Sequence, residues 1–255
     1  MKLSVCIPMY NESAVIGGTL NTLYRYLLNF TAARGIDAEL IVADDGSTDG
    51  CGEIVRTFME THGGGAVRLR LTGYPDNRGK GAAVRCAVLA SEGDVVFFTD
   101  SDLAYGADVI AEAYDRLSAS PDTAVLIGSR NLRKDGYEGY TPLRKLMSKT
   151  YIKVLNIAAG FSLSDSQCGC KAFKGDCARR IFALCQTDSF AFDIEAILLS
   201  QTLHYKIAEM PVKIINHRQS KVHILRDTLH MLSDIQKIRG RVRRIEKDLG
   251  GGGAF

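Results

Sequence analysis

The first half of the chain alternates short apolar runs with amphipathic segments, and this alternation limits the fold more than any other feature. Strands are predicted over residues 3–8, 38–43, 67–71, 94–99 and 123–127, with helices over 13–29, 50–62, 79–91 and 108–118 between them. Apolar strands joined by helices are typical of a mostly parallel sheet that is covered on both faces. We therefore expect an α/β fold whose ligands bind at the carboxyl ends of its strands.

Polar side chains follow three of these strands at the point where each strand ends. The clusters are Tyr10-Asn11-Glu12, Asp44-Asp45-Gly46-Ser47 and Asp100-Ser101-Asp102. Because parallel strands bring their carboxyl ends to one edge of the sheet, these clusters are expected to lie close together. The sequence therefore predicts one polar site at this edge.

Asp100 and Asp102 flank a serine at the exit of an apolar strand. Two carboxylates this close together are not buried without partners, and from an extended segment both can face one cation. Hard divalent ions such as Mg²⁺ and Mn²⁺ take oxygen ligands and bridge to phosphates. We predict that Asp100 and Asp102 hold such an ion. The alternative is that Asp102 only caps the following turn.

Two further segments suit the parts of a nucleotide. Asp44 and Asp45 can accept hydrogen bonds from a base or a ribose hydroxyl, although a solvated turn at a helix N-terminus explains the same residues. Residues 77–81 combine two cations and two glycines with a predicted helix N-terminus, which suits a diphosphate. They lack the spacing of a P-loop, and no Gly-x-Gly-x-x-Gly follows the first strand. The sequence therefore does not favour a kinase-type NTPase or a dinucleotide-binding protein.

The second half of the chain departs from the alternation. We predict helices over 143–158, 190–202 and 222–249, a strand over 205–215 and an irregular segment over 165–173. The resulting division is a main domain over residues 1–220, a basic C-terminal helix over 221–249 and a flexible glycine-rich tail over 250–255.

Residues 142–160 form a candidate membrane-interface helix. Its apolar stripe holds Leu143, Leu146, Met147, Tyr151, Val154, Leu155 and Ala158, beside Arg144, Lys145, Lys149 and Lys153. Basic amphipathic helices lie in membrane interfaces, but the same period fits a helix that packs on the core with a solvated basic face. The basic run from Lys237 to Lys247 adds attraction to an anionic leaflet.

Charge, cysteine content and motif spacing argue against several other classes of protein. A net charge of +3, and a basic run without interleaved aromatic residues, argue against nucleic-acid binding. Seven scattered cysteines favour a reducing compartment over a disulfide framework, and Cys168-Gly169-Cys170 lacks the partners of a zinc site. We expect no targeting segment, no membrane-spanning helix and a cytoplasmic setting.

Taken in order, these motifs resemble a known family. The segments 5–12, 44–49, 77–81 and 100–102 are similar to the inverting GT-A glycosyltransferases of family 2. The segments 165–173, 190–195 and 220–222 narrow the resemblance to the dolichyl-phosphate β-glucosyltransferases and their bacterial polyprenyl-phosphate relatives. The resemblance covers about residues 3–235 and implies a GT-A fold, which is Rossmann-like, with basic amphipathic helices toward the C-terminus.

The resemblance also implies roles for individual residues. On the donor side, it implies that the nucleotide sugar is bound by Pro8, Tyr10, Glu12, Asp44, Asp45, Lys80 and Ser101, that Lys221 lies over the diphosphate, and that Asp100 and Asp102 hold Mg²⁺ or Mn²⁺. It implies that Arg130 and Arg144 bind the acceptor phosphate. The residues implied at the sugar are Asp165, Gln167 and Asp193. The predicted catalytic residues are Asp102, Arg130, Asp165 and Asp193. Asp165 would orient the acceptor, stabilise positive charge on the sugar or act as a base, and an alcohol acceptor would require the base.

The predicted function is therefore a metal-dependent transfer of a hexose with inversion. Glucose is the favoured sugar, a UDP-sugar the favoured donor, and a polyprenyl or dolichyl phosphate at the cytoplasmic face of a membrane the acceptor, with the protein bound peripherally. Three alternatives stay open: a soluble GT-A enzyme that glycosylates a polysaccharide or protein, a GDP-mannose-dependent polyprenyl-phosphate mannosyltransferase, and a sugar-nucleotide-binding module without catalysis. The sequence sets no oligomeric state.

Overall fold

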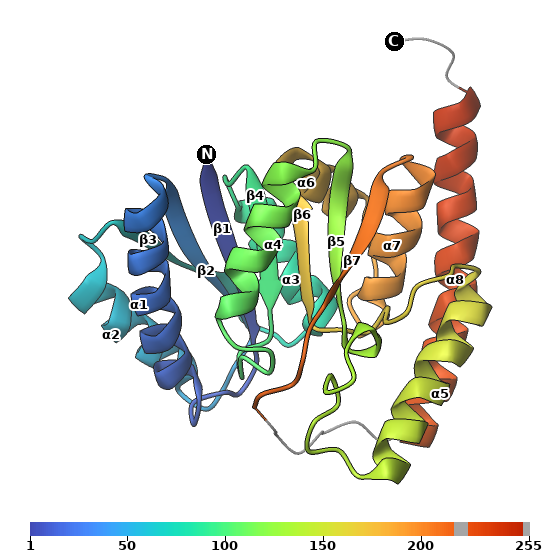
Figure 1. Cartoon of the computed structure of the whole chain (residues 1–255), viewed down its shortest axis with the longest axis horizontal. Helices are drawn as coiled ribbons and strands as arrows, with labels where there is room; N and C mark the ends of the chain where they lie inside the picture. The colour runs from blue at the N-terminus through green and yellow to red at the C-terminus, as the bar shows by residue number, and fades with distance from the viewer. Residues whose placement is uncertain (217–223, 252–255) are drawn as a thin grey trace.

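A seven-stranded sheet forms the centre of the computed structural model, which describes residues 1–216 and 224–251 (Figure 1). Its spatial order is β3-β2-β1-β4-β6-β5-β7. The strands are β1 (Lys2–Met9), β2 (Asp37–Asp45), β3 (Val67–Tyr74), β4 (Val95–Thr99), β5 (Thr123–Ser129), β6 (Cys170–Lys174) and β7 (Lys206–Pro211). Only β6 runs against its neighbours β4 and β5, so the described sheet is mostly parallel, as predicted.

Helices cover both faces of this sheet. They are α1 (Ile16–Arg34), α2 (Cys51–His62), α3 (Lys80–Ala90), α4 (Asp108–Ala119), the short 3-10 helix η1 (Arg130–Leu132), α5 (Pro142–Ala159), α6 (Gly175–Leu184), α7 (Phe192–Thr202) and α8 (Ile224–Gly251). Side chains alternate across each strand: Val5 and Ile7 of β1 join the core under α1, α2 and α4, whereas Cys6 joins the core under α3, α6 and α7. Burial on both faces explains the nearly continuous apolar strands.

The predictions for the second half needed correction. The segment expected to be irregular over 165–173 contains β6, and α6 was not predicted. In β6 the fully buried Lys171 interrupts the apolar pattern, and a five-residue strand offers little periodicity to detect. The strand expected over 205–215 is confined to Lys206–Pro211, and α8 continues through Gly250 and Gly251, where a flexible tail was expected.

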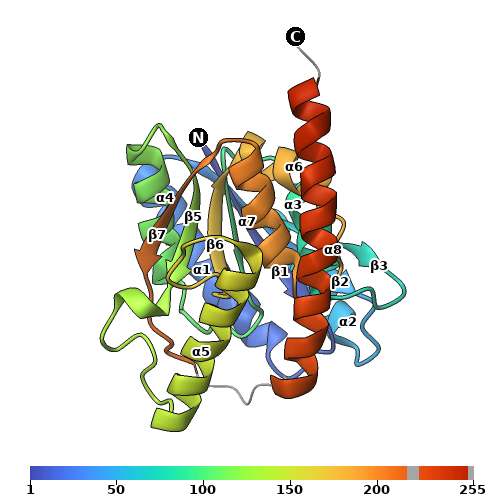
Figure 2. The same cartoon turned by 90° about the vertical axis from the view of Figure 1, so that its right-hand side faces the viewer.

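Helices α5 and α8 lie side by side at one end of the sheet (Figure 2). The α8 side chains Met231, Ile235, Ile238 and Val242 belong to the same core as α3, α6 and α7, so α8 packs against the domain. The predicted boundary between residues 220 and 221 lies outside the described residues. In the part of the chain that the structure describes, no helix has the length and apolar content to span a membrane.

The predicted apolar stripe of α5 is divided between two faces. Ile152, Leu155 and Ala159 point into the core. Leu143, Leu146 and Ile157 are 67%, 63% and 70% exposed, and Met147 and Val154 also face solvent. The helix thus has a second apolar face that is not covered by the described chain.

Candidate active site

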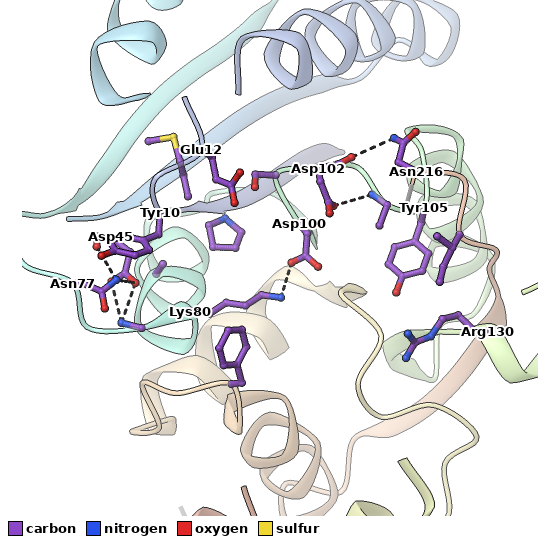
Figure 3. Close-up of a pocket in the computed structure, with 18 of the residues that line it drawn as sticks. Tyr10, Glu12, Asp45, Asn77, Lys80, Asp100, Asp102, Tyr105, Arg130 and Asn216 are labelled. Carbon is purple, nitrogen blue, oxygen red and sulfur yellow. Dashed lines mark hydrogen bonds and ion pairs between the residues drawn. The ribbon is translucent and has the colours of Figure 1, made fainter. Parts of the chain in front are cut away.

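A cleft of about 560 Å³ opens at the carboxyl ends of the central strands (Figure 3). Its lining includes Pro8, Tyr10, Glu12, Asp45, Asn77, Lys80, Asp100, Ser101, Asp102, Tyr105, Arg130, Tyr140, Arg144, Phe190 and Asn216. The polar clusters that follow β1, β2 and β4 therefore meet in one place, because parallel strands end at one edge.

Asp100 is held on two sides within the cleft. Lys80 Nζ lies 2.5 Å from Asp100 Oδ1. On the other side the backbone of Gly169 approaches so closely that a Cβ added there would collide with Asp100 Oδ2. A side chain at position 169 would thus collide with Asp100, and the Gly169 backbone supports the Asp100 carboxylate.

The Lys80 ammonium lies among negative charges. Burial by itself would lower the pKa of Lys80, but the charges of Asp100 and Asp193 outweigh this effect and hold the pKa above its usual value. Lys80 therefore stays protonated near neutral pH and supplies a permanent positive charge to the cleft.

Asp193 pairs with a lysine that the sequence did not indicate as functional. Lys171 Nζ lies 2.6 Å from Asp193 Oδ1 and donates a hydrogen bond to Cys168 O at 2.7 Å. Both charged side chains are buried. Burial raises the pKa of Asp193, and the charges of Lys171 and Lys80 oppose that rise. Removing one partner would leave the other charge buried and unpaired, which would destabilise the fold.

The loop that carries Asp102 is tied to the segment after β7. Asn216 Nδ2 donates to the carbonyl oxygens of Asp102 and Leu103 at 3.2 and 2.9 Å. Leu103 has a φ of 48°, in the left-handed region, and Asp102 Oδ1 accepts a hydrogen bond from Ala104 N at 3.1 Å. Asn216 was not predicted, since no motif marks it.

The two carboxylates fit a hard divalent cation. Asp100 and Asp102 line the cleft from one short loop, and their oxygens are the ligands that Mg²⁺ and Mn²⁺ prefer. Among the described residues, no group of three His, Cys, Asp or Glu side chains could hold a metal ion by itself. Mg²⁺ commonly uses one or two carboxylates and completes its shell with water and substrate phosphates.

Asp45 organises the turn that precedes α3. Its carboxylate accepts hydrogen bonds from Asn77 Nδ2 at 2.8 Å, Arg78 N at 2.8 Å and Gly79 N at 2.9 Å. Gly79 has a φ of 116°, which favours glycine. The turn directs Lys80, the first residue of α3, toward Asp100.

Asp44 does not line this cleft. Its carboxylate accepts a hydrogen bond from Ser47 N at 2.9 Å and lines a separate surface pocket. The other residues predicted for the uridine, Pro8, Tyr10 and Glu12, do line the main cleft. In this structure Asp45, rather than Asp44, lies with them.

Asp165 is fully buried and binds Arg130. Arg130 Nε lies 2.6 Å from Asp165 Oδ2, and a second guanidinium nitrogen lies 2.9 Å from Oδ1. This bidentate geometry fixes the plane of the guanidinium. Burial tends to lower the pKa of Arg130, but nearby Tyr105 and Asp165 keep it well above its usual value. Asp165 does not reach the cleft itself, whereas Arg130 does.

A second arginine reaches the cleft from the start of α5. The Arg144 guanidinium lies over the ring of Tyr140, 4.0 Å from its centroid. Thr141 caps the helix by accepting a hydrogen bond from Arg144 N at 3.2 Å. The first turn of α5 therefore presents a cation to the same cleft that Arg130 lines.

Two other predicted site residues do not line the cleft. Asp193 is buried, and Gln167 has its Nε2 buried without a hydrogen-bond partner. The predicted Lys221 lies outside the described residues. The residues that the sequence missed are Lys171, Tyr105, Tyr140 and Asn216.

The family model described as "Glycosyl transferase family 2" matches residues 4–182. The chain belongs to glycosyltransferase family 2. It is 32% identical over 223 residues to a dolichyl-phosphate beta-glucosyltransferase of Trichomonas vaginalis, covering 86% of this chain and 65% of that protein. It is 29% identical over 245 residues to the enzyme of the same name from Dictyostelium discoideum, covering 94% and 74%. The chain is thus a glycosyltransferase, as predicted.

Solved structures show the same fold. Glucosyl-3-phosphoglycerate synthase from Mycobacterium tuberculosis, in complex with Mn²⁺, UDP and glucosyl-3-phosphoglycerate, matches with a TM-score of 0.65 and 19% identity, covering 94% of this chain and 80% of that one. A mannosyltransferase from Pyrobaculum calidifontis, in complex with GDP-Man and Mn²⁺, matches with a TM-score of 0.55 and 19% identity, covering 99% and 76%. These similarities confirm the predicted glycosyltransferase fold.

Proposed function

We propose that this glycosyltransferase moves a hexose, with inversion, from a UDP-sugar to a polyprenyl phosphate at the cytoplasmic face of a membrane, and that glucose is the sugar. The relatives named dolichyl-phosphate beta-glucosyltransferase favour this acceptor and sugar. The observation that carries the proposal is the pair of arginines, Arg130 and Arg144, which meet in the same cleft as Lys80, Asp100 and Asp102.

The donor is proposed to bind along the ends of β1, β2 and β4. Pro8, Tyr10 and Glu12 are suited to the base and Asp45 to the ribose, because all four line the cleft next to the turn over residues 77–79. Helix α3 begins at Lys80, so the positive end of the helix dipole and the Lys80 ammonium favour a diphosphate there.

Asp100 and Asp102 are proposed to hold Mg²⁺ or Mn²⁺. When bound, the metal would supply Lewis-acid stabilisation of the charge that develops on the leaving diphosphate. The chain's own contribution is to fix the two carboxylates: Gly169 supports Asp100, and Asn216 supports the loop of Asp102. Lys80 adds a positive charge on the same side of the cleft.

The acceptor side is suited to a phosphate rather than to an alcohol. A phosphate monoester has a second pKa near 6 and is mostly a dianion at pH 7, so it needs orientation more than deprotonation. Asp165, the base expected for an alcohol acceptor, is buried and paired with Arg130. We assign Asp165 as a positioning residue that aims the Arg130 guanidinium at the acceptor phosphate.

The exposed apolar face of α5 supports the proposed membrane location. This face is formed by Leu143, Leu146, Met147, Val154 and Ile157. It continues from the turn that carries Arg144 into the cleft. A helix with exposed apolar side chains and flanking lysines binds at the boundary between head groups and acyl chains. A lipid phosphate could then reach the arginines without leaving the bilayer.

The decisive experiment offers radiolabelled UDP-glucose, with Mn²⁺, to the full chain in liposomes that contain a short polyprenyl phosphate. Labelled lipid should form and should disappear with EDTA. The change Asp102→Asn should lower kcat by at least about a hundredfold, since metal stabilisation of a leaving group is worth several kcal/mol. Asp176→Asn, at a fully exposed aspartate side chain, serves as the matched control.

Other results would redirect the proposal. Transfer from GDP-mannose in preference to UDP-glucose would make the enzyme a mannosyltransferase. Equal transfer to a water-soluble saccharide, with no dependence on the polyprenyl phosphate, would contradict the lipid acceptor. Full activity in EDTA would remove the metal role from Asp100 and Asp102.

A further inference from the structure

Both oxygens of the Asp100 carboxylate are already in contact with protein. Oδ1 lies 2.5 Å from Lys80 Nζ, and Oδ2 lies against the backbone of Gly169. Lys80 thus occupies one oxygen of a carboxylate that remains partly exposed. A divalent cation that approaches Asp100 meets the Lys80 ammonium as a competitor, because two positive charges at one carboxylate repel each other.

Other negative charges also act on Lys80. The charges of Asp193 and Asp102 raise the pKa of the Lys80 ammonium together with that of Asp100. Asp193 has its own partner, since Lys171 Nζ lies 2.6 Å from Asp193 Oδ1. Lys80 itself is on a long side chain at the first position of α3 and is partly exposed to the cleft. The ammonium can thus turn toward the cleft without becoming an unpaired buried charge.

The protein alone offers a cation few ligands. Two carboxylates, from Asp100 and Asp102, are present, and no larger acidic or Cys/His group occurs within residues 1–216 and 224–251. A diphosphate supplies the missing oxygens, and its negative charge also supplies a new partner for Lys80. Metal and diphosphate should consequently bind much better together than either does alone.

We propose that Lys80 is the counter-ion of Asp100 only while the cleft is empty, and that joint binding of the divalent cation and the donor diphosphate transfers Lys80 from the carboxylate to a phosphate oxygen. This inference rests on the metal and donor of the proposed function and not on its acceptor. Lys80 then prevents metal from occupying the site without a donor, and it becomes a phosphate ligand once the donor is present.

The test is a pair of binding measurements on the full chain, without turnover. Mn²⁺ alone should bind Lys80→Met about tenfold more tightly than the unchanged protein, since a competing charge near a partly exposed carboxylate has been removed. UDP in the presence of saturating Mn²⁺ should bind Lys80→Met about tenfold more weakly, because the phosphate loses a cation. Electron paramagnetic resonance of free Mn²⁺ measures the first change, and calorimetry measures the second.

Two further variants control for charge and folding. Lys206→Met removes one positive charge from an exposed site on β7 and should change neither affinity. Lys80→Arg keeps the charge and should keep the weak binding of Mn²⁺ alone. Unchanged or weaker binding of Mn²⁺ alone to Lys80→Met would overturn the inference, as would tight Mn²⁺ binding to the unchanged protein without nucleotide. Loss of transfer to polyprenyl phosphate with these binding changes intact would instead count against the proposed acceptor.

Discussion

Helices α5 and α8 lie side by side, and both combine basic with apolar residues (Figure 2). In α8 the apolar side chains Met231, Ile235, Ile238 and Val242 face the core. In α5 only part of the apolar surface faces the core, and Leu143, Leu146 and Ile157 lie in solvent. The two helices therefore differ in where their apolar residues point, which their compositions do not reveal.

Their basic residues differ as well. Arg241 of α8 donates two hydrogen bonds to the buried Glu195 at 3.1 and 2.7 Å, and Arg239 donates to Ala158 O of α5 at 2.8 Å. These arginines attach α8 to the domain, so Arg241, which belongs to the predicted basic run, has an internal partner in Glu195. Lys237, Arg243, Arg244 and Lys247 are exposed on the described part of α8, and Lys237 lies 3.6 Å from the Asp234 carboxylate.

The largest effect, on the free energy of unfolding, is expected from removing the ion pair that holds α8 against the domain. The change Glu195→Ala removes the partner of Arg241 and of the backbone N–H groups of Gln186 and Thr187. Breaking a buried ion pair on one side costs about 3 kcal/mol or more. Urea denaturation should show a loss of that size in the free energy of unfolding.

Glu246→Ala is the control for this prediction, because Glu246 is exposed on α8. It should change the free energy of unfolding by less than about 0.5 kcal/mol. A similarly small change for Glu195→Ala would mean that α8 is not held by its arginines, and the contrast between the two helices would lose its basis.

The second effect concerns the exposed face of α5. Replacing Leu143, Leu146 and Ile157 together by Ser should lower the partition coefficient onto liposomes by about a hundredfold or more, since each apolar side chain that enters an interface contributes about 1 kcal/mol or more. The melting temperature should stay the same, because none of the three is buried. Liposome co-sedimentation and thermal denaturation give the two measurements.

Leu155→Ser sharpens the comparison, since Leu155 lies on the opposite, fully buried face of α5. That change should destabilise the fold by about 3 kcal/mol. If the triple variant also unfolds, the exposed face is part of the core. If it folds and binds liposomes as well as the unchanged protein, α5 is not the membrane contact.

The smallest effect is expected from the exposed bases of α8. Replacing Lys237, Arg243 and Arg244 by Gln should weaken binding to anionic liposomes about tenfold at low salt. Each charge near an anionic surface contributes at most about 1 kcal/mol, so a tenfold loss lies within the range that three charges allow. The difference should vanish near 0.5 M salt, where the Debye length is only a few ångströms. Salt-independent loss would indicate a packing role for these residues instead.

Hydrophobic patterning was sufficient to predict the strands β1 to β5, because strands such as β1 and β4 are buried on both faces and form continuous apolar runs, but it did not predict β6. The motif order was sufficient to predict which strand ends form the cleft. Lys171 shows the limit of hydrophobic patterning. A charged residue interrupts the apolar run of a buried strand, and the sequence does not reveal that Asp193 is its partner. Asp44 and Asp45 are equally acidic neighbours, and only the hydrogen bonds from Asn77 and Gly79 distinguish the one that lines the cleft.

Strands β5 and β6 are antiparallel neighbours, so the chain between them, residues 130–169, leaves and re-enters the sheet at the edge that bears the cleft. Arg130, Arg144 and the exposed face of α5 all belong to this excursion, whereas the residues proposed for the donor lie on the turns after β1, β2 and β4. Under the proposed function, the acceptor and the donor are therefore bound by separate stretches of chain. Exchange of residues 131–164 for the matching stretch of a relative should then change which acceptor is used and leave nucleotide binding as it is.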